Sequence, residues 1–158
     1  MTHRLRRATP LDAGQLGTIL HRFELETPWM PKTHSAAEAI AFCDRMIARG
    51  WVTVAERRDS NLRQAFLARD GDEVCALYVD PDLCGHGLGK ALLDQAKSEV
   101  AQLRLWTFQA NTGAMRFYQR EGFVEAGRSD GLCNDEGLPD IEYHWHRAHK
   151  SDQTEPRP

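Results

Sequence analysis

A glycine-rich segment is the part of this sequence best suited to binding a phosphate. Gly85, Gly87 and Gly89 occupy alternate positions between an apolar run, residues 74–79, and an amphipathic segment. This order predicts a strand, a loop and the first turn of a helix. Main-chain N–H groups can converge in such a loop, and the helix N-terminus adds about half a positive charge. The segment is therefore a candidate anion site, and the alternative is a turn whose glycines only relieve backbone strain.

The residues before the glycines carry signals for helices and strands that would position this loop. Thr9, Pro10 and Asp12 predict the start of a first helix, and Ser35 with Glu38 forms a capping box that opens a second. We expect strands at 5–7, 51–56, 62–69 and 74–79, and a loop with two prolines at 26–34. Short polar turns join the last three strands, which predicts an antiparallel meander.

The residues after the glycines continue the alternation of helix and strand. We expect a helix to about residue 100, a strand at 103–108, a helix at 111–121, and strands at 123–128 and 141–146. Asn111 is suited to cap the second of these helices, and Gly122 is suited to close it. The connection at 129–139 is long enough to suggest a functional loop. The elements together predict an α+β fold with a mixed central sheet.

Composition limits the classes of protein that this chain can represent. Its 158 residues, 41% hydrophobic and 27% charged, predict one domain over residues 1–150 and a flexible tail at 151–158. The net charge of -3 and the pI near 6.2 disfavour a nucleic-acid partner. No apolar run approaches the roughly 20 residues that span a bilayer, and the N-terminus lacks the apolar region of a signal peptide. We therefore expect a cytoplasmic protein without a membrane partner.

Cysteine and histidine spacing gives little indication of a metal site. The four cysteines form no C-x-x-C pair, so we expect reduced and mostly buried thiols. Cys84 precedes a predicted helix N-terminus, and a helix N-terminus lowers the pKa of a nearby thiol. Two interpretations of Cys84 remain: a reactive thiol, or a passive substitution. His144 and His146 share one face of a predicted strand, with His149 beyond, but no third ligand is evident. We expect no metal.

Two segments taken together resemble the GCN5-related N-acetyltransferase (GNAT) superfamily. Residues 77–93, LYVDPDLCGHGLGKALL, are similar to its acyl-CoA pyrophosphate loop, Q/R-x-x-G-x-G/A, and residues 103–123, LRLWTFQANTGAMRFYQREGF, to its strand–Asn–helix–Tyr–Gly-Phe pattern. The resemblance covers nearly the whole chain. It implies a mixed, mostly antiparallel sheet of about seven strands flanked by about four helices. Cys84 stands where the family has Gln or Arg, so one side-chain contact to phosphate is missing.

The resemblance implies acetyl-CoA as the acyl donor. The residues implied for donor binding are Leu77, Tyr78, Val79, Cys84, Gly85, His86, Gly87, Leu88, Gly89, Lys90, Asn111 and Tyr118. The Val79 N–H would donate to the thioester oxygen, and Tyr118 would protonate the departing thiolate. Alternatives remain for three of these: Asn111 as a helix cap, Tyr118 as a core tyrosine, and Lys90 as a solvated helix residue.

The acceptor side and the base are less clearly marked. An amine with a pKa of about 10.4 is almost wholly protonated at pH 7, so a base or a water chain should take its proton. Our candidate base is Glu73. The other base candidates are Glu24, Glu26, His34, Asp130, Asp135 and Glu136. The family places residues 24–34 and 129–139 over the thioester, which implies Trp29, Met30, His34, Asp135 and Glu136 as substrate-binding residues. The acidic second loop suits a cationic amine.

These observations predict an acetyl-CoA-dependent N-acetyltransferase. The acyl group would pass to a primary amine of a small molecule or peptide by direct attack in a ternary complex. Family analogy adds a homodimer. One rival is a catalytically idle acyl-CoA-binding or regulatory module on the same fold. A second rival, a nucleotide-binding protein, would need the Walker ending K-[ST], but Ala91 follows Lys90.

Overall fold

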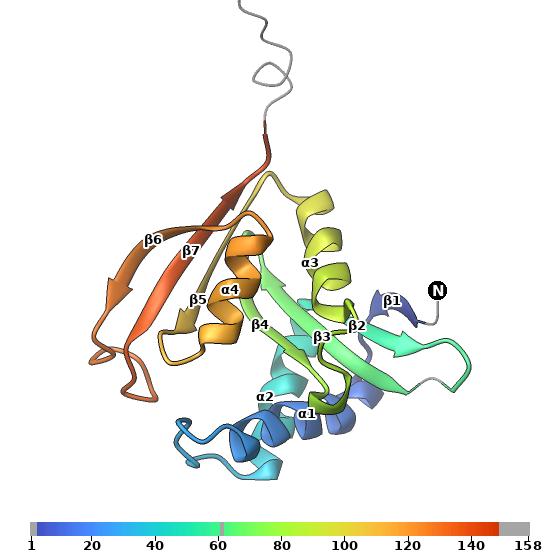
Figure 1. Ribbon diagram of the computed structural model, residues 1–158. Coiled ribbons are helices and arrows are strands. Elements are labelled where there is room, and N and C mark those ends of the chain that lie inside the picture. Colours follow the sequence, from blue (N-terminus) through green and yellow to red (C-terminus); the bar gives the residue numbers. More distant parts are fainter. Residues whose placement is uncertain (1–2, 61, 149–158) are drawn as a thin grey trace, which may run out of the picture.

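Seven strands form one sheet in the computed structural model, which describes residues 3–60 and 62–148 (Figure 1). The strand order is β1-β2-β3-β4-β5-β7-β6. All neighbouring strands are antiparallel except β4 and β5, which are parallel. The predicted α+β fold with a mixed, mostly antiparallel sheet and four helices is confirmed. The expected tail at 151–158 lies outside the described residues, and the single-domain assignment stays a prediction.

The elements follow the order expected from the sequence. The strands are β1 (His3–Arg7), β2 (Val52–Arg57), β3 (Arg63–Asp70), β4 (Glu73–Val79), β5 (Gln102–Phe108), β6 (Val124–Ser129) and β7 (Asp140–His146). The helices are α1 (Ala13–Glu26), α2 (Ala36–Ala48), α3 (Leu88–Glu99) and α4 (Thr112–Arg120), with short 3-10 turns η1 (Pro10–Asp12) and η2 (Pro81–Leu83). The first helix differs from expectation because its proline-led start forms the separate turn η1.

Side-chain caps explain where two of the helices begin. The Ser35 hydroxyl accepts from the Glu38 N–H at 3.1 Å, while the Glu38 carboxylate accepts from the Ser35 N–H at 2.7 Å. The Asn111 carboxamide oxygen accepts from the Ala114 N–H at 3.0 Å at the start of α4. Each bond satisfies a helix N–H group that has no partner within the helix. Both predicted caps are therefore present.

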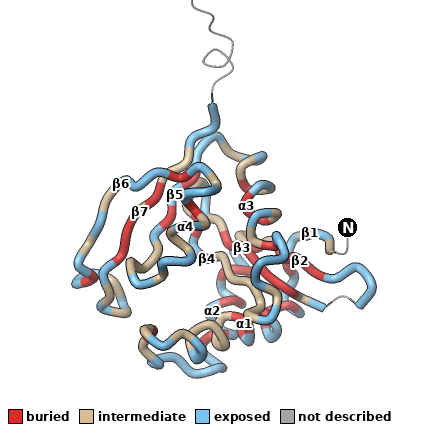
Figure 2. Tube along the Cα trace, viewed as in Figure 1, coloured by how far each residue is buried: buried red, intermediate tan, exposed pale blue. Residues whose placement is uncertain are grey.

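Two apolar clusters cover the two faces of the sheet. Leu16 of α1 and Cys43 of α2 pack on one face with Phe66 of β3. On the other face, Leu92 of α3 and Tyr143 of β7 belong to a second cluster that also includes residues of α4. Figure 2 shows buried segments running along the central strands, with exposed residues on the outer turns and helix faces. The sheet is thus enclosed between two pairs of helices.

A buried ionic network ties β1 to η1 and β2. The wholly buried Asp12 accepts two hydrogen bonds from Arg6, at 2.8 and 2.9 Å, and one from Arg63 at 2.7 Å. Glu56, also buried, accepts from Arg6 and Arg4. Burial raises the pKa of Asp12, but the hydrogen bonds from Arg6, from the main chain and from Arg63 outweigh it and hold that pKa well below its usual value. These contacts fix the first strand to the sheet.

The sheet opens between its two parallel strands. β4 pairs with β5 at a single register position, Glu73 with Arg104. The register of β3 and β4 shifts at Cys75, which has no partner between the pairs formed by Val74 and Ala76. Such a bulge bends a strand and increases its twist, so β4 parts from β5 beyond this point. The edge of β4 that faces β5 is left free to pair with a ligand.

No helix within residues 3–60 and 62–148 has the length and apolar character to cross a membrane.

Candidate active site

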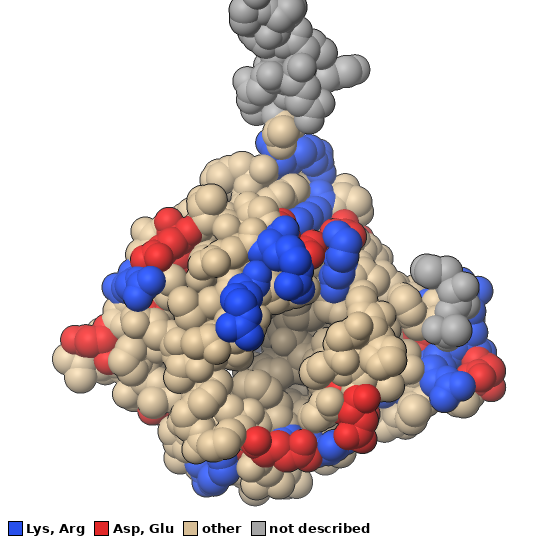
Figure 3. Space-filling model, in the orientation of Figure 1, with Lys and Arg blue, Asp and Glu red and all other residues tan. Residues whose placement is uncertain are grey.

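A cavity of about 670 Å³ lies where β4 and β5 part. Its walls come from β4, the glycine loop, the start of α3, the end of β5 and one face of α4. Figure 3 shows the hollow in the centre of the molecule, with Lys and Arg side chains above it and Asp and Glu below it. Most of the predicted donor-binding residues line this one cavity. They are Leu77, Tyr78, Val79, Cys84, Gly85, Gly87, Leu88, Gly89, Lys90, Asn111 and Tyr118.

The glycine loop presents main-chain N–H groups at one end of the cavity. Gly85 and Gly87 have φ angles of 90° and 80°, a region that other residues rarely adopt. Gly87 is the N-cap of α3 and provides no side-chain cap, so the first N–H groups of that helix keep no protein side chain as partner. Buried Leu88 anchors the loop in the core. These features fit an anion site, and the assignment stays a prediction.

The side chains of the loop contribute less positive charge than expected. Lys90 lines the cavity, but its ammonium group lies 3.1 Å from the Glu121 carboxylate and 3.3 Å from that of Asp94. The exposed His86 is not among the residues that line the cavity. Partial burial and the nearby Asp80 raise the pKa of Cys84, so the expectation of a lowered pKa is wrong. The physical reason is that burial and the charge of Asp80 both disfavour the thiolate, and α3 begins only at Leu88, four residues after Cys84.

The expectation of mostly buried thiols is also wrong. Cys43 is buried in the core, whereas Cys75, Cys84 and Cys133 are exposed. Cys75 is exposed because the bulge in β4 turns it out of the regular alternation, and it lines the cavity with Cys84. Cys133 lies on the loop between β6 and β7. All four are free cysteines.

Tyr118 is a buried tyrosine whose side chain reaches the cavity wall. Its ring packs on Phe117, Phe123 and Tyr143 at centroid distances of 5.1, 5.5 and 6.2 Å. Within the described residues its hydroxyl has no hydrogen-bond partner. Burial, with a smaller effect of Tyr78, raises the pKa of Tyr118 well above its ordinary value. The phenol is therefore protonated at neutral pH, and its hydroxyl is available as a hydrogen-bond donor to a bound group.

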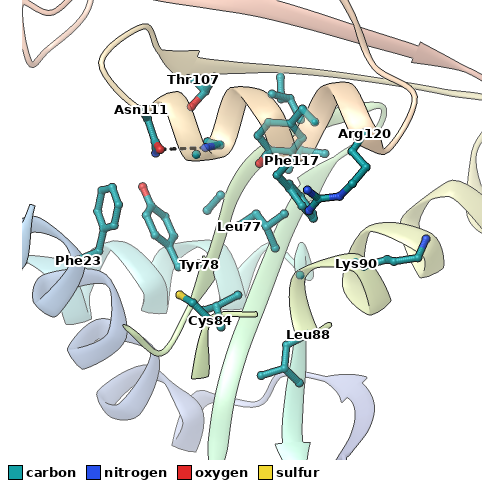
Figure 4. Close-up of a pocket in the computed structure, with 18 of the residues that line it drawn as sticks. Phe23, Leu77, Tyr78, Cys84, Leu88, Lys90, Thr107, Asn111, Phe117 and Arg120 are labelled. Atoms are coloured by element: carbon teal, nitrogen blue, oxygen red, sulfur yellow. Dashed lines mark hydrogen bonds between the residues drawn. The ribbon is translucent and has the colours of Figure 1, made fainter. Parts of the chain in front are cut away.

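A group of aromatic rings forms the other end of the cavity. Phe23 of α1 packs on Tyr78 at 5.2 Å and on Trp29 at 6.3 Å, and Trp29 reaches Phe108 at the end of β5, at 5.8 Å. Burial raises the pKa of Tyr78 to about 12, with further effects of nearby Glu136 and Glu24. Figure 4 shows Phe23 and Tyr78 on the side of Asn111, and Lys90 on the opposite side. The cavity thus has an aromatic end bordered by carboxylates.

The residues predicted to bind the acceptor lie around this aromatic end but not on the cavity wall. Trp29 joins the aromatic group, and Met30 is buried beside it in the chain. The main-chain N–H of His34 donates to Glu24 at 3.1 Å, and its ring Nδ1 lies 3.2 Å from the second Glu24 oxygen. The Glu24 side chain is only 13% exposed. The structure therefore holds this carboxylate firmly near the aromatic rings.

A hydrogen-bond network shapes the loop at 130–139, which carries the predicted residues Asp135 and Glu136. The Ser129 hydroxyl donates to Asp140, and the Asn134 amide donates to Leu138 and Asp140 at 2.7 and 3.2 Å. Gln109, just after β5, donates to the carbonyls of residues 129 and 140. Exposed Asp135 and half-buried Glu136 are therefore carried by an ordered loop next to β5.

Glu73, the predicted base, lies outside the cavity lining. It is at the start of β4, where that strand still pairs with β5, and its carboxylate is 3.7 Å from Arg104. The geometry does not bring it to the aromatic end of the cavity. Glu24 and Glu136 are the carboxylates whose charges act on Tyr78 there.

Within residues 3–60 and 62–148, no three His, Cys, Asp or Glu side chains are grouped as a metal site. His144 lies 3.0 Å from the Glu142 carboxylate, and its ring is 6.4 Å from that of His146. His149, the third histidine considered in the sequence, lies outside the described residues.

The cavity wall also includes side chains that were not predicted as site residues, among them Phe23, Phe117 and Arg120. Phe23 enters from α1, half-buried Phe117 comes from α4, and Arg120 lies at the end of α4. Phe117 and Arg120 are three residues apart, which places them on one face of the helix. That spacing was readable in the sequence, but the direction of the face depends on how α4 packs.

Comparisons with known proteins agree with this fold. Residues 48–125, about half of the chain, match the acetyltransferase (GNAT) domain family. The peptidyl-lysine N-acetyltransferase YjaB of Salmonella typhimurium is 34% identical over 89 residues, which are 56% of this chain and 58% of that protein. The chain thus matches little more than half the length of this relative.

Solved structures share the fold over almost the full length. The solution structure of apo-form YjaB from Escherichia coli has a TM-score of 0.76 at 23% identity, covering 94% of this chain and 100% of that one. The structure of yncA from Salmonella typhimurium with its cofactor acetyl-CoA has a TM-score of 0.69 at 19% identity, covering 95% and 97%. With the glycine loop, the parted strands and the family match in agreement, the chain belongs to the GNAT acetyltransferase family.

Proposed function

We propose that this protein is an acetyl-CoA-dependent N-acetyltransferase that acts on a primary amine. One observation carries the proposal: a single cavity joins the anion-binding loop, the free edge of β4, the buried phenol of Tyr118 and an aromatic end bordered by carboxylates. These are the features that an acyl donor and an amine need to meet in one site. Direct attack in a ternary complex requires both to be bound together, and the cavity volume of about 670 Å³ suits this.

The donor would lie along the cavity from the loop to the aromatic rings. Its pyrophosphate would accept hydrogen bonds from the loop and the first turn of α3. The pantetheine arm would pair with the free edge of β4 at Leu77, Tyr78 and Val79, much as a peptide adds to a sheet edge. Asn111 lines the same path (Figure 4). In this arrangement the Val79 N–H is our candidate donor to the thioester oxygen, which gains negative charge during attack.

The chemistry follows from which atoms gain and lose protons. The neutral amine attacks the thioester carbonyl carbon, the carbon–sulfur bond breaks, and the thiolate takes a proton from the Tyr118 hydroxyl. The phenol carries this proton at neutral pH, and because burial raises the pKa of Tyr118, the transfer depends on the negative charge that develops on the sulfur. The amine must lose a proton to a carboxylate or water. Neither Glu24 nor Glu73 lines the cavity. We assign the role of base to Glu24 because its charge acts on Tyr78 at the aromatic end. Glu73 is instead paired with Arg104.

We further propose that the acceptor is the side chain of a lysine in a peptide. A lysine side chain is an apolar stem that ends in a cation, and the aromatic end with Glu24 and Glu136 offers both an apolar wall and negative charge. The relative YjaB, matched over 56% of this chain, is named a peptidyl-lysine N-acetyltransferase. That name supports the same class of acceptor.

The test is release of CoA thiol from acetyl-CoA with a short peptide that has one internal lysine and a blocked N-terminus. A peptide with glutamine in place of the lysine is the negative control. We expect the E24Q and E136Q variants to raise the KM for the peptide about tenfold, the effect of losing one charge-assisted contact, while the KM for acetyl-CoA stays unchanged. E24Q should also lower kcat, because Glu24 is the assigned base.

The E125Q variant, which alters an exposed carboxylate on β6 paired with Arg128, is the matched control and should behave like wild type. If the protein binds CoA but acetylates no amine, the idle binding module is the better description. If E73Q rather than E24Q slows turnover, the base assignment from the sequence is right and ours is wrong.

A further inference from the structure

Only two cations line the cavity among the described residues, Lys90 and Arg120. An acyl-CoA donor brings several negative charges from its pyrophosphate and 3′-phosphate, and such charges are usually met by Arg or Lys as well as by main-chain N–H groups. How the phosphates of the donor are bound therefore depends on whether these two side chains already form ion pairs within the protein.

Lys90 is already engaged within the protein. Its ammonium group contacts Glu121 at 3.1 Å and Asp94 at 3.3 Å. The hydrogen bond to Glu121 is the main cause that raises the pKa of Lys90. The Glu121 side chain is only 7% exposed, so a shift of Lys90 towards a ligand would leave a buried carboxylate without its partner. Figure 4 shows Lys90 extending away from the cavity.

The glycine loop offers no other free cation. Cys84 occupies the position of the family's Gln or Arg and is uncharged, since burial raises its pKa. His86 does not line the cavity. Main-chain N–H groups alone would then bind the phosphates, unless a charge came from another element.

Arg120 is the cation that has no carboxylate partner. Its guanidinium rests over the Phe117 ring, 5.8 Å from the centroid, and it forms no ion pair within the described residues. In Figure 4 its side chain extends from the end of α4 back towards Phe117 and the cavity. It lies roughly 13 Å along the helix from Asn111, which separates it from the aromatic end. Figure 3 shows the basic side of the hollow.

We propose that Arg120 binds a phosphate of the acyl donor and provides the positive charge that Cys84 cannot. Phe117 holds the guanidinium over the cavity, which reduces the rotamer freedom lost on binding. The phosphate belongs to the pyrophosphate or to the 3′-position. This inference rests on the proposed use of acetyl-CoA.

The test is a calorimetric titration of CoA, 3′-dephospho-CoA and pantetheine into the wild-type, R120Q and R49Q proteins. Arg49 is a matched control, because its guanidinium also rests over an aromatic ring, that of Trp51, and it does not line the cavity. We expect R120Q to weaken CoA binding about tenfold, to leave pantetheine binding unchanged, and R49Q to bind all three ligands like wild type. R120K, which keeps the charge but not the planar fork, should lose less than R120Q.

The ligand set identifies which phosphate is involved. If R120Q weakens CoA but not 3′-dephospho-CoA, the contact is to the 3′-phosphate, and if it weakens both, the contact is to the pyrophosphate. Wild-type affinity of R120Q for CoA, or an equal loss for pantetheine, overturns the proposal and leaves the proposed function intact. If the wild-type protein binds none of the three ligands, the proposed function fails and this assignment fails with it. Arg120 is exposed, so R120Q should keep its fold, which circular dichroism can verify.

Discussion

Replacing Tyr118 with Phe removes one hydroxyl from the cavity wall and leaves the packing around it in place. The ring contacts with Phe117, Phe123 and Tyr143 involve no hydroxyl, and the phenol oxygen has no hydrogen-bond partner among the described residues. The variant therefore leaves no buried group unsatisfied. We expect its free energy of unfolding to stay within about 1 kcal/mol of wild type and its affinity for CoA within about twofold.

The effect on turnover should be much larger. General acid catalysis contributes about 10²- to 10⁴-fold, which corresponds to about 3–5 kcal/mol in the transition state. The assay is kcat for acetyl-CoA with the lysine peptide, together with a CoA titration on the same protein. A loss of 100-fold or more in kcat with unchanged CoA affinity is the expected pattern.

Tyr143 provides a matched control for this experiment. It is wholly buried next to Tyr118, but its hydroxyl accepts from the Gln119 amide at 3.2 Å and it does not line the cavity. Y143F should lower the free energy of unfolding by about 1 kcal/mol and leave kcat unchanged. If Y118F turns over at more than a third of the wild-type rate, or if Y143F is the slower variant, Tyr118 is not the acid.

Two further predictions concern the stability of the fold and the order of the acceptor loop. The D12N variant removes the buried carboxylate that pairs with both Arg6 and Arg63, and it should cost about 3–5 kcal/mol in urea unfolding at pH 7. The pKa of Asp12 is lowered in the folded protein, so its contribution to the free energy of unfolding is present above the ordinary carboxyl pKa of about 3.9 and falls as the pH drops below it. The difference in unfolding free energy between wild type and D12N should therefore shrink below about pH 4. A difference that stays constant contradicts this. In G131A, the added Cβ, at a residue with φ 88°, would lie 2.3 Å from the Leu138 carbonyl carbon, so the loop could not keep its present conformation. The KM for the peptide should therefore rise, while the KM for acetyl-CoA should not. G137A is the control, because residue 137 has φ 68° and no atom lies within 4 Å of the added Cβ. It carries only backbone strain of about 1 kcal/mol and should keep the wild-type KM for the peptide. Equal effects of G131A and G137A on that KM would show that crowding at Leu138 is not the cause.

The order of elements was predictable because each depends on signals within a few residues. Ser35 with Glu38 and Asn111 with Ala114 form their caps within three residues, and two of the loop glycines, Gly85 and Gly87, adopt positive φ angles. The antiparallel meander also follows from short turns. Closing the short loops between such residues costs little conformational entropy, so the local sequence is enough to specify these contacts.

Contacts between distant segments were not predictable in this way. Asp12 meets Arg63 across 51 residues, and no local pattern marks either as part of a buried network. The bulge that exposes Cys75 and opens β4 depends on the register with β3, which two strands set jointly. The resemblance to the family implied donor-binding residues here, but the cavity that they line depends on this register.

The charges around the cavity show why the base and the phosphate contacts were the least predictable features. By sequence, Lys90 follows the glycines and Glu73 precedes them, so each has a plausible place in the reaction. In the structure, Lys90 forms an ion pair with Glu121, and Glu73 forms one with Arg104 on β5. A charged side chain that already has a close partner must lose that contact before it can serve a ligand, and the lost contact reduces what binding gains. The side chains that can act on a ligand are of two kinds. Some have no such partner in the fold, and others, like Glu24, are held beside the aromatic end of the cavity. Spacing along the chain cannot identify them, because the pairing is decided by elements that meet only in the folded protein.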